Sequence, residues 1–205
     1  MLSYGAELGR KALHLGALVL PLALLVWGRP IVWVLGPLAV LAVALDVARQ
    51  RVPAVREPLL RIFGFLMRPE EIPPPGGPLV LNGAVWMCVA AAVCGLLFPP
   101  ALAAAALAMQ MIGDAAAAIV GRRLGRTRWP GQRKTVEGTA AFFVTALLTG
   151  WALAHLPIDG LAAALPLGRL ALGAAVAAVV ETLPVPPNDN LRVSVAAAAA
   201  MLLVG

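Results

Sequence analysis

Apolar runs follow one another along the chain, most of them about as long as a membrane-spanning helix and the last one short. A helix needs about 20 mostly apolar residues to cross the hydrocarbon core of a bilayer. Ala and Leu dominate the runs, without the period-two alternation of β-barrel strands. The sequence therefore predicts an all-α polytopic membrane protein, a single domain over residues 1–205 with about seven transmembrane helices. The predicted spans are roughly 11–28, 31–48, 79–98, 101–120, 138–155, 167–180 and 191–204.

The basic residues predict the orientation of these spans. If the spans alternate in direction, 14 of the 16 Lys and Arg residues share one side, and only Arg29 and Arg169 lie opposite. Loops rich in Lys and Arg stay in the cytoplasm. We therefore expect a protein of the plasma (inner) membrane with this basic side in the cytoplasm. The rule also explains the net charge of +6 without a nucleic-acid partner.

Residues 49–78 differ in composition from the spans around them. Five arginines occur there, and between Val55 and Met67 two of them are interspersed with Leu, Ile and Phe. This pattern is typical of an amphipathic helix that lies in the membrane interface. The segment ends in a Pro-Gly cluster, PPPGGP, at 73–78.

The stretch Gln110–Thr139 combines features that a simple span lacks. Asp114 lies inside a predicted span, where a charged group costs about 2.5–3.5 kcal/mol on insertion scales and is a functional candidate by default. A loop with six basic residues follows it. Cations beside a carboxylate suit a phosphorylated, metal-bound substrate. The structural alternative is a basic loop that sets topology, with Asp114 bonded to a neighbouring helix.

Three acids, Asp114, Glu181 and Asp189, lie in or near the predicted cytoplasmic ends of different spans. Magnesium usually takes one or two carboxylates and leaves its other positions to water and phosphate. Glycines in the loop would let the backbone approach an anion. GQRKT at 131–135 is not a Walker A loop, because Arg133 precedes Lys134 and no strand comes before it.

Residues 113–143 resemble the central signature of the CTP-dependent lipid-alcohol kinases, a family that includes dolichol kinase, phytol kinase and a CTP-dependent diacylglycerol kinase. The resemblance rests on Gly113-Asp114, Ala117, Gly121, Gly125 and residues 134–139, KTVEGT. Three other stretches are similar in order and spacing to family motifs. These are Arg10-Lys11-x-x-His14, Arg68-Pro69-Glu70 with Asn82-Gly83-Ala84, and Glu181 with Asp189-Asn190.

The resemblance implies a kinase that transfers the γ-phosphate of CTP to a membrane lipid alcohol at the cytoplasmic face and releases CDP, with Mg²⁺ as cofactor. The implied catalytic residues are Asp114, Lys134, Glu137 and Asp189. The implied nucleotide-binding residues are Gly121, Arg122, Arg123, Gly125, Arg133, Lys134, Thr135, Gly138 and Thr139. Arg10, Lys11, His14, Arg68, Glu70, Asn82 and Asn190 would complete the substrate site. Asp114, Glu181 and Asp189 would hold the metal.

Two other functions compete with the kinase hypothesis. Phosphatidate cytidylyltransferases belong to the same wider superfamily, but nothing like their C-terminal signature occurs in PPNDNLRVSV. A small transporter would also place polar groups in spans, although here the polar groups gather on one predicted side. The sequence does not identify the alcohol, and it leaves open whether acids act as base or metal ligand and whether the protein forms a homodimer.

Overall fold

The computed structural model describes residue 9 and residues 15–204, and its regular structure there is helical. The only departure in these residues is one isolated antiparallel bridge between Arg128 and Thr135. The all-α fold class is therefore confirmed. The elements are α2 (Val19–Trp27), η1 (Arg29–Ile31), α3 (Val32–Arg51), α4 (Pro53–Phe63), η2 (Gly64–Leu66), η3 (Pro69–Glu71), α5 (Gly83–Leu97), α6 (Pro100–Arg123), α7 (Val136–Ala154), α8 (Leu161–Ala164), α9 (Leu167–Thr182) and α10 (Asp189–Leu203).

Helix length supports fewer spans than the sequence predicts. Among the described residues, three helices are long and apolar enough to cross a membrane, at Arg29–Arg51, Pro100–Arg123 and Val136–Ala154. They indicate a membrane protein. Helices α5, α9 and α10 have 15, 16 and 15 residues, which is short of the roughly 20 that a perpendicular span needs. The predicted count of about seven is not confirmed.

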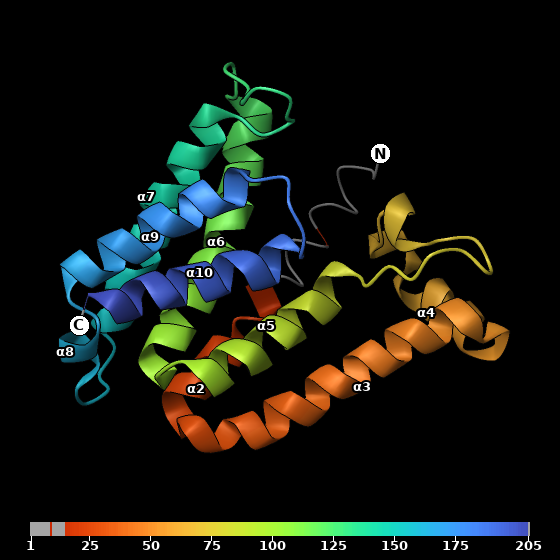
Figure 1. Cartoon of the computed structure of the whole chain (residues 1–205), viewed down its shortest axis with the longest axis horizontal. Coiled ribbons are helices and arrows are strands. Elements are labelled where there is room, and N and C mark those ends of the chain that lie inside the picture. Colours follow the sequence, from red (N-terminus) through yellow and green to blue (C-terminus); the bar gives the residue numbers. More distant parts are fainter. Residues whose placement is uncertain (1–8, 10–14, 205) are drawn as a thin grey trace.

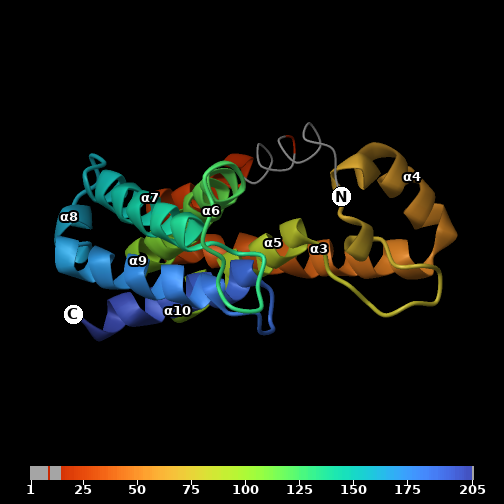
Figure 2. The same ribbon diagram turned by 90° about the horizontal axis from the view of Figure 1, so that it is seen from above.

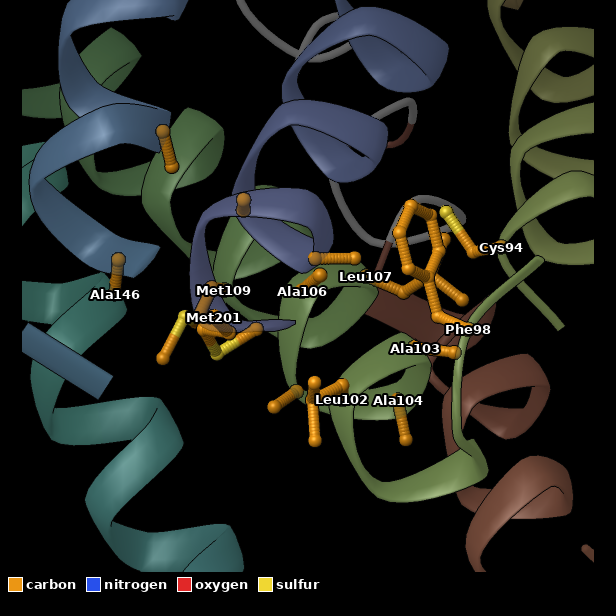
Figure 3. Packing of buried hydrophobic residues seen from close by; sticks show 14 of the residues in the cluster. Cys94, Phe98, Leu102, Ala103, Ala104, Ala106, Leu107, Met109, Ala146 and Met201 are labelled. Atoms are coloured by element: carbon orange, nitrogen blue, oxygen red, sulfur yellow. The ribbon is translucent and has the colours of Figure 1, made fainter. Parts of the chain in front are cut away.

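Helix α6 is the centre of the molecule. It packs against α2, α5, α7, α9 and α10, and Ala103–Ala106 are completely buried within it. Small side chains let helix backbones approach closely, so the alanine run allows five neighbours to share one central helix. Larger residues fill the remaining space, and Figure 3 shows Met109 beside Met201 and the ring of Phe98 beside Cys94 in this core.

Glycines set the close packing of α6 against α7. A Cβ atom added at Gly113 would lie 2.9 Å from the ring of Phe142, and one added at Gly138 would lie 3.0 Å from the carbonyl oxygen of Ala117. Phe142 is fully buried. The positions therefore require glycine because a neighbouring helix occupies the space of a side chain.

The connections between helices gather at two ends of the molecule. In Figure 1 the loop between α6 and α7 lies at the top, and the connection from α9 to α10 lies at the right-hand ends of those two helices. Element η1, α8 and the C-terminus lie at the lower left. Figure 2 shows α3 leaving the other helices, with α4 at its far end. The arrangement brings the predicted basic connections to one side of the fold.

A helix does form in the segment expected to lie in the membrane interface. It covers Pro53–Phe63 and continues into η2. Ile62, Phe63 and Phe65 are exposed, at 58%, 44% and 64% of their surface. Large apolar groups exposed beside arginines suit a membrane surface, and the interfacial position of α4 stays a prediction.

Candidate active site

The loop between α6 and α7 is a closed hairpin. The backbone N–H of Trp129 donates to the carbonyl oxygen of Lys134 at 3.0 Å, and that of Val136 donates to Thr127 at 2.9 Å. These bonds surround the bridge between Arg128 and Thr135. The hairpin therefore fixes the backbone on either side of Lys134, so this residue extends from a fixed position.

The first turn of α7 holds the hairpin in place. Thr135 caps the helix, since its Oγ1 accepts a hydrogen bond from the N–H of Gly138 at 3.1 Å. The Glu137 carboxylate accepts the N–H of Thr127 through Oε1 at 3.1 Å. The indole N–H of Trp129 donates to Thr139 Oγ1 at 2.9 Å. Thr135, Glu137 and Thr139 of the KTVEGT block thus have structural contacts that position the loop.

Lys134 joins two acids from distant parts of the chain. Its Nζ lies 2.8 Å from Glu181 Oε1, at the end of α9, and 3.1 Å from Asp189 Oδ2, at the start of α10. It also donates to the carbonyl oxygen of Glu181. Asp189 pairs in turn with Arg192. We call these four residues, Lys134, Glu181, Asp189 and Arg192, the Lys134 cluster.

The Lys134 cluster is partly open to solvent. The side chain of Lys134 is 31% exposed and that of Asp189 is 43% exposed, whereas that of Glu181 is 8% exposed. Burial raises the pKa of Glu181, Lys134 opposes that rise, and the negative charges of Asp114 and Asp189 add to it. All three acids singled out in the sequence therefore act on one region, at the same end of the fold.

The donor atoms of this region fit Mg²⁺ in their chemistry. Glu181 and Asp189 supply the hard carboxylate oxygens that the ion prefers, and one or two such ligands suffice when substrate phosphates complete its shell. No group of three or more His, Cys, Asp or Glu residues that could hold a metal occurs in the part of the chain that the structure describes. A magnesium ion here would thus depend on the phosphates of its substrate, and the metal assignment stays a prediction.

Three glycines predicted to bind nucleotide, one each in α6, the loop and α7, lie against Thr135 in this structure. Added Cβ atoms at Gly121, Gly125 and Gly138 would lie 3.0, 2.8 and 3.0 Å from its hydroxyl oxygen. Close packing of the hairpin on α6 and α7 is therefore one physical reason for these glycines. Their predicted role in nucleotide binding is untested and stays a prediction.

Arg122, Arg123 and Arg133 are exposed around the hairpin. Arg122 and Arg123 come from the last turn of α6, and Arg133 immediately precedes Lys134. Their predicted contact with a nucleotide remains a prediction. Arg10, Lys11 and His14 lie outside the described residues.

Asn190 is buried and links α10 to two other helices through hydrogen bonds. Its Oδ1 accepts a hydrogen bond from Gln110 Nε2 on α6 at 2.8 Å, and its Nδ2 donates to the carbonyl oxygen of Gly83 at the start of α5 at 2.9 Å. Its neighbour Asp189 is in the Lys134 cluster. Asn190 therefore positions Asp189 by fixing the first turn of α10. The sequence signal for this contact was a glutamine inside an apolar span.

Asn82 belongs to a second polar region, which sequence reasoning missed. Its backbone N–H and Nδ2 both donate to the Asp46 carboxylate at 2.9 Å. Arg49 pairs with the same carboxylate and donates through Nη2 to the carbonyl oxygen of Glu71 at 2.8 Å. We call Asp46, Arg49, Gln50, Glu71 and Asn82 the Asp46 network. An acid near the end of a span was the one signal that could have revealed it.

The predicted Arg68-Pro69-Glu70 motif contributes to this second region only through its neighbour. Arg68 and Glu70 are exposed. Glu71 accepts the N–H of Arg68 at 3.0 Å and that of Gly83 at 3.2 Å. The structure therefore brings Asn82 and Glu71 together with α3, and it leaves Arg68 and Glu70 at the surface.

Comparison with known proteins adds two findings. The chain is 30% identical to the uncharacterized protein RP860 of Rickettsia prowazekii over 142 residues, which cover 69% of this chain and 67% of the relative. The chain belongs to the same family as RP860. A 37-residue segment, 18% of the chain, is 57% identical to dolichol kinase of Saccharomyces cerevisiae. That match spans only 7% of the yeast protein.

The other comparisons found no counterpart. No family model matches the chain, and no solved structure is similar to it. The local similarity to dolichol kinase is thus the finding that bears on chemistry, and it supports a relation to lipid kinases over a short segment.

Proposed function

We propose that this protein is a kinase that transfers the γ-phosphate of CTP to the hydroxyl of a membrane lipid alcohol. The observation that carries the proposal is the Lys134 cluster, in which one lysine meets acids from α9 and α10 beside a basic hairpin. The short similarity to yeast dolichol kinase supports the same reaction class. Phosphoryl transfer requires little covalent chemistry from a protein and depends on positioning and charge stabilisation.

In the proposed reaction the lipid hydroxyl attacks the γ-phosphorus of CTP. A new bond forms between oxygen and phosphorus, the bond from that phosphorus to the β–γ bridging oxygen breaks, and CDP leaves. The hydroxyl proton passes to a carboxylate of Asp114, Glu181 or Asp189. Lys134 and one or more of Arg122, Arg123 and Arg133 bind the phosphate oxygens, where their charge stabilises the transition state.

Lys134 has a second task in this proposal. Without nucleotide it neutralises Glu181 and Asp189, and with nucleotide its ammonium group is shared with phosphate oxygens. Bound Mg²⁺ would neutralise part of the phosphate charge, with Glu181 and Asp189 as its protein ligands. The partly exposed side chain of Lys134 allows this change without opening the core.

The lipid alcohol would enter sideways from the membrane, with its tail in lipid and its hydroxyl at the polar end of the fold. We propose that this end faces the cytoplasm of the inner membrane, since it carries most of the basic residues. The preferred alcohol class is an isoprenoid. The Lys134 cluster shows charged groups for phosphate, whereas nothing in it is reserved for a glycerol ester.

The deciding experiment follows the label of CTP. Purified protein is incubated with CTP labelled at the α or the γ position, together with a polyprenol, a short isoprenoid alcohol, diacylglycerol or phosphatidate. We expect γ label on an alcohol, together with CDP. Transfer of α label to phosphatidate with release of pyrophosphate would show a cytidylyltransferase instead. Parallel reactions with ATP test the choice of nucleotide.

A further inference from the structure

A second cationic site lies away from the Lys134 cluster. A cavity of about 220 Å³ opens between the end of α3, the beginning of α4 and the Pro75-Gly76 turn. No member of the Lys134 cluster lines it. Figure 1 shows α4 and the end of α3 at the right, whereas the hairpin between α6 and α7 lies at the top. The cavity therefore needs an explanation of its own.

Arg49 is the most deeply buried charged group at this cavity, with 1% of its surface exposed. Its Nε pairs with Asp46, and its Nη2 donates to Glu71. Its Nη1 is buried and has no hydrogen-bond partner among the described residues. A buried charged donor without an acceptor is unfavourable, and such a group in a native fold calls for a specific explanation.

Arg56 repeats this arrangement on the same cavity. Its Nη2 donates to the carbonyl oxygen of Pro73 at 2.9 Å. Its Nη1 is buried and, within the part of the chain that the structure describes, also lacks a partner. Arg51 lines the cavity as a third guanidinium. The two acids of the network already accept hydrogen bonds, Asp46 from Arg49 and Asn82 and Glu71 from backbone N–H groups. No acid is among the described residues that line the cavity, so the lining keeps an excess of positive charge.

We propose that this cavity binds a phosphate group, presented by an anionic lipid headgroup or by a soluble phosphate compound. Two guanidinium groups, Arg49 anchored through Nε and Nη2 and Arg56 through Nη2, each with a buried Nη1 that lacks a partner among the described residues, offer the planar donors that match phosphate oxygens. The exposed Ile62, Phe63 and Phe65 would bring α4 to the membrane surface, within reach of headgroups. The site does not depend on the proposed kinase activity.

The test uses the full chain in phosphatidylcholine nanodiscs without nucleotide. Its thermal unfolding is followed while phosphatidylglycerol, oleate or soluble pyrophosphate is added. A ligand that binds only the folded state raises the unfolding temperature. We expect phosphatidylglycerol or pyrophosphate to stabilise the protein. Oleate adds negative charge to the bilayer without adding phosphate, so we expect it to have a smaller effect.

Variants identify the site. Arg56→Gln should weaken the apparent affinity for the active phosphate ligand by at least about tenfold, which corresponds to ~1.4 kcal/mol. Arg61→Gln, an exposed change on the same helix, should leave it unaltered. Arg56→Lys keeps the charge without the planar donors and should give an intermediate loss, so it serves if Arg56→Gln fails to fold. Soluble pyrophosphate can also bind at the Lys134 cluster, so the comparison is repeated in the Lys134→Ala background, where the loss caused by Arg56→Gln should persist.

The outcomes distinguish a lipid headgroup from a soluble phosphate compound, and they also show whether the proposed site exists. If Arg56→Gln removes a response to phosphatidylglycerol, the ligand is a lipid headgroup. If the response is confined to pyrophosphate and Arg56→Gln removes it, the ligand is a soluble phosphate compound. Equal stabilisation of the wild type and Arg56→Gln would overturn the proposal. An oleate effect as large as that of phosphatidylglycerol, or no response to any addition, would overturn it as well.

Discussion

The Lys134 cluster and the Asp46 network contain similar residue types but differ in burial and in bonding. Asp46 and Arg49 are 3% and 1% exposed, and the Asp46 carboxylate accepts from Arg49 and from both donors of Asn82. Lys134 and Asp189 keep 31% and 43% of their side chains in contact with solvent. The Asp46 network is bonded within the protein, whereas the Lys134 cluster can exchange its partners.

This difference indicates distinct tasks for two regions that would look alike in a list of charged residues. A buried ion pair contributes strongly only while both partners are present, because removal of one leaves an uncompensated charge. Exposed pairs contribute much less to stability. We therefore expect substitutions in the Asp46 network to act on folding, and substitutions in the Lys134 cluster to act on chemistry.

The largest effect should follow Asp46→Ala. The change removes the acceptor shared by Arg49 and Asn82 and leaves Arg49 buried without its counter-ion, at a cost of about 3–5 kcal/mol. Thermal unfolding in detergent measures it. Asp159→Ala, which removes an exposed acid, is the matched control. Equal unfolding temperatures for the two variants would show that the network does not stabilise the fold.

Lys134→Ala should lower turnover by about 10²–10³-fold, the usual effect of removing one group that stabilises transition-state charge. Its unfolding temperature should fall less than that of Asp46→Ala, because the cluster is partly exposed. The measurement is transfer of the γ label of CTP, with Arg126→Ala from the same hairpin as control. Wild-type turnover in Lys134→Ala would remove this residue from the reaction.

Thr135→Ala should have an intermediate effect on stability. The hydroxyl of Thr135 caps α7, and loss of such a cap costs about 1 kcal/mol. Thermal unfolding compares it with Thr149→Ala, whose hydroxyl bonds only within its own helix at the Thr145 carbonyl oxygen. A lower turnover of Thr135→Ala than of Thr149→Ala would show that the hairpin position matters for chemistry. Equal stability of the two would contradict the capping role.

The smallest effect should follow Arg128→Ala. Arg128 is exposed, and a surface substitution of this kind usually changes stability by less than about 0.5 kcal/mol. We expect turnover close to that of the wild type in detergent, and a weaker association with vesicles that contain anionic lipid, which attract each basic residue by roughly 1 kcal/mol. A large loss of turnover in detergent would place Arg128 in the reaction and would blur the distinction between the basic hairpin and Lys134 itself.

Local sequence patterns predicted several features correctly. Apolar runs of Ala and Leu predicted the helical fold class, and the observed α6 and α7 cover their predicted spans at 101–120 and 138–155 with differences only near the ends. The amphipathic segment after Arg49 is helical over Pro53–Phe63. These features depend on residues within a few turns of one another, so composition and periodicity suffice to predict them.

The number of long helices was harder to predict than their existence. The runs at 79–98, 167–180 and 191–204 are apolar, and their helices contain 15, 16 and 15 residues, which is fewer than a perpendicular span needs. Asn82 caps α5, and Asn188 caps α10. Hydropathy measures transfer from water and does not distinguish a span from a helix buried among others, which explains the difference in count.

The sequence by itself determined the helical class, the basic loop and the identity of the charged residues that could carry chemistry. Only the tertiary structure decided their partners. Lys134 lies 47 residues from Glu181 and 55 from Asp189, and its contacts with them arise because α7, α9 and α10 pack together with α6. The packing of α10 on α5 and α6 places Asn190 between Gln110 and Gly83, and the packing of α3 with α5 accompanies the burial of Asp46 and Arg49. The physical reason is that a buried charge requires a partner, and which partner is near is set by the packing of distant helices rather than by spacing along the chain.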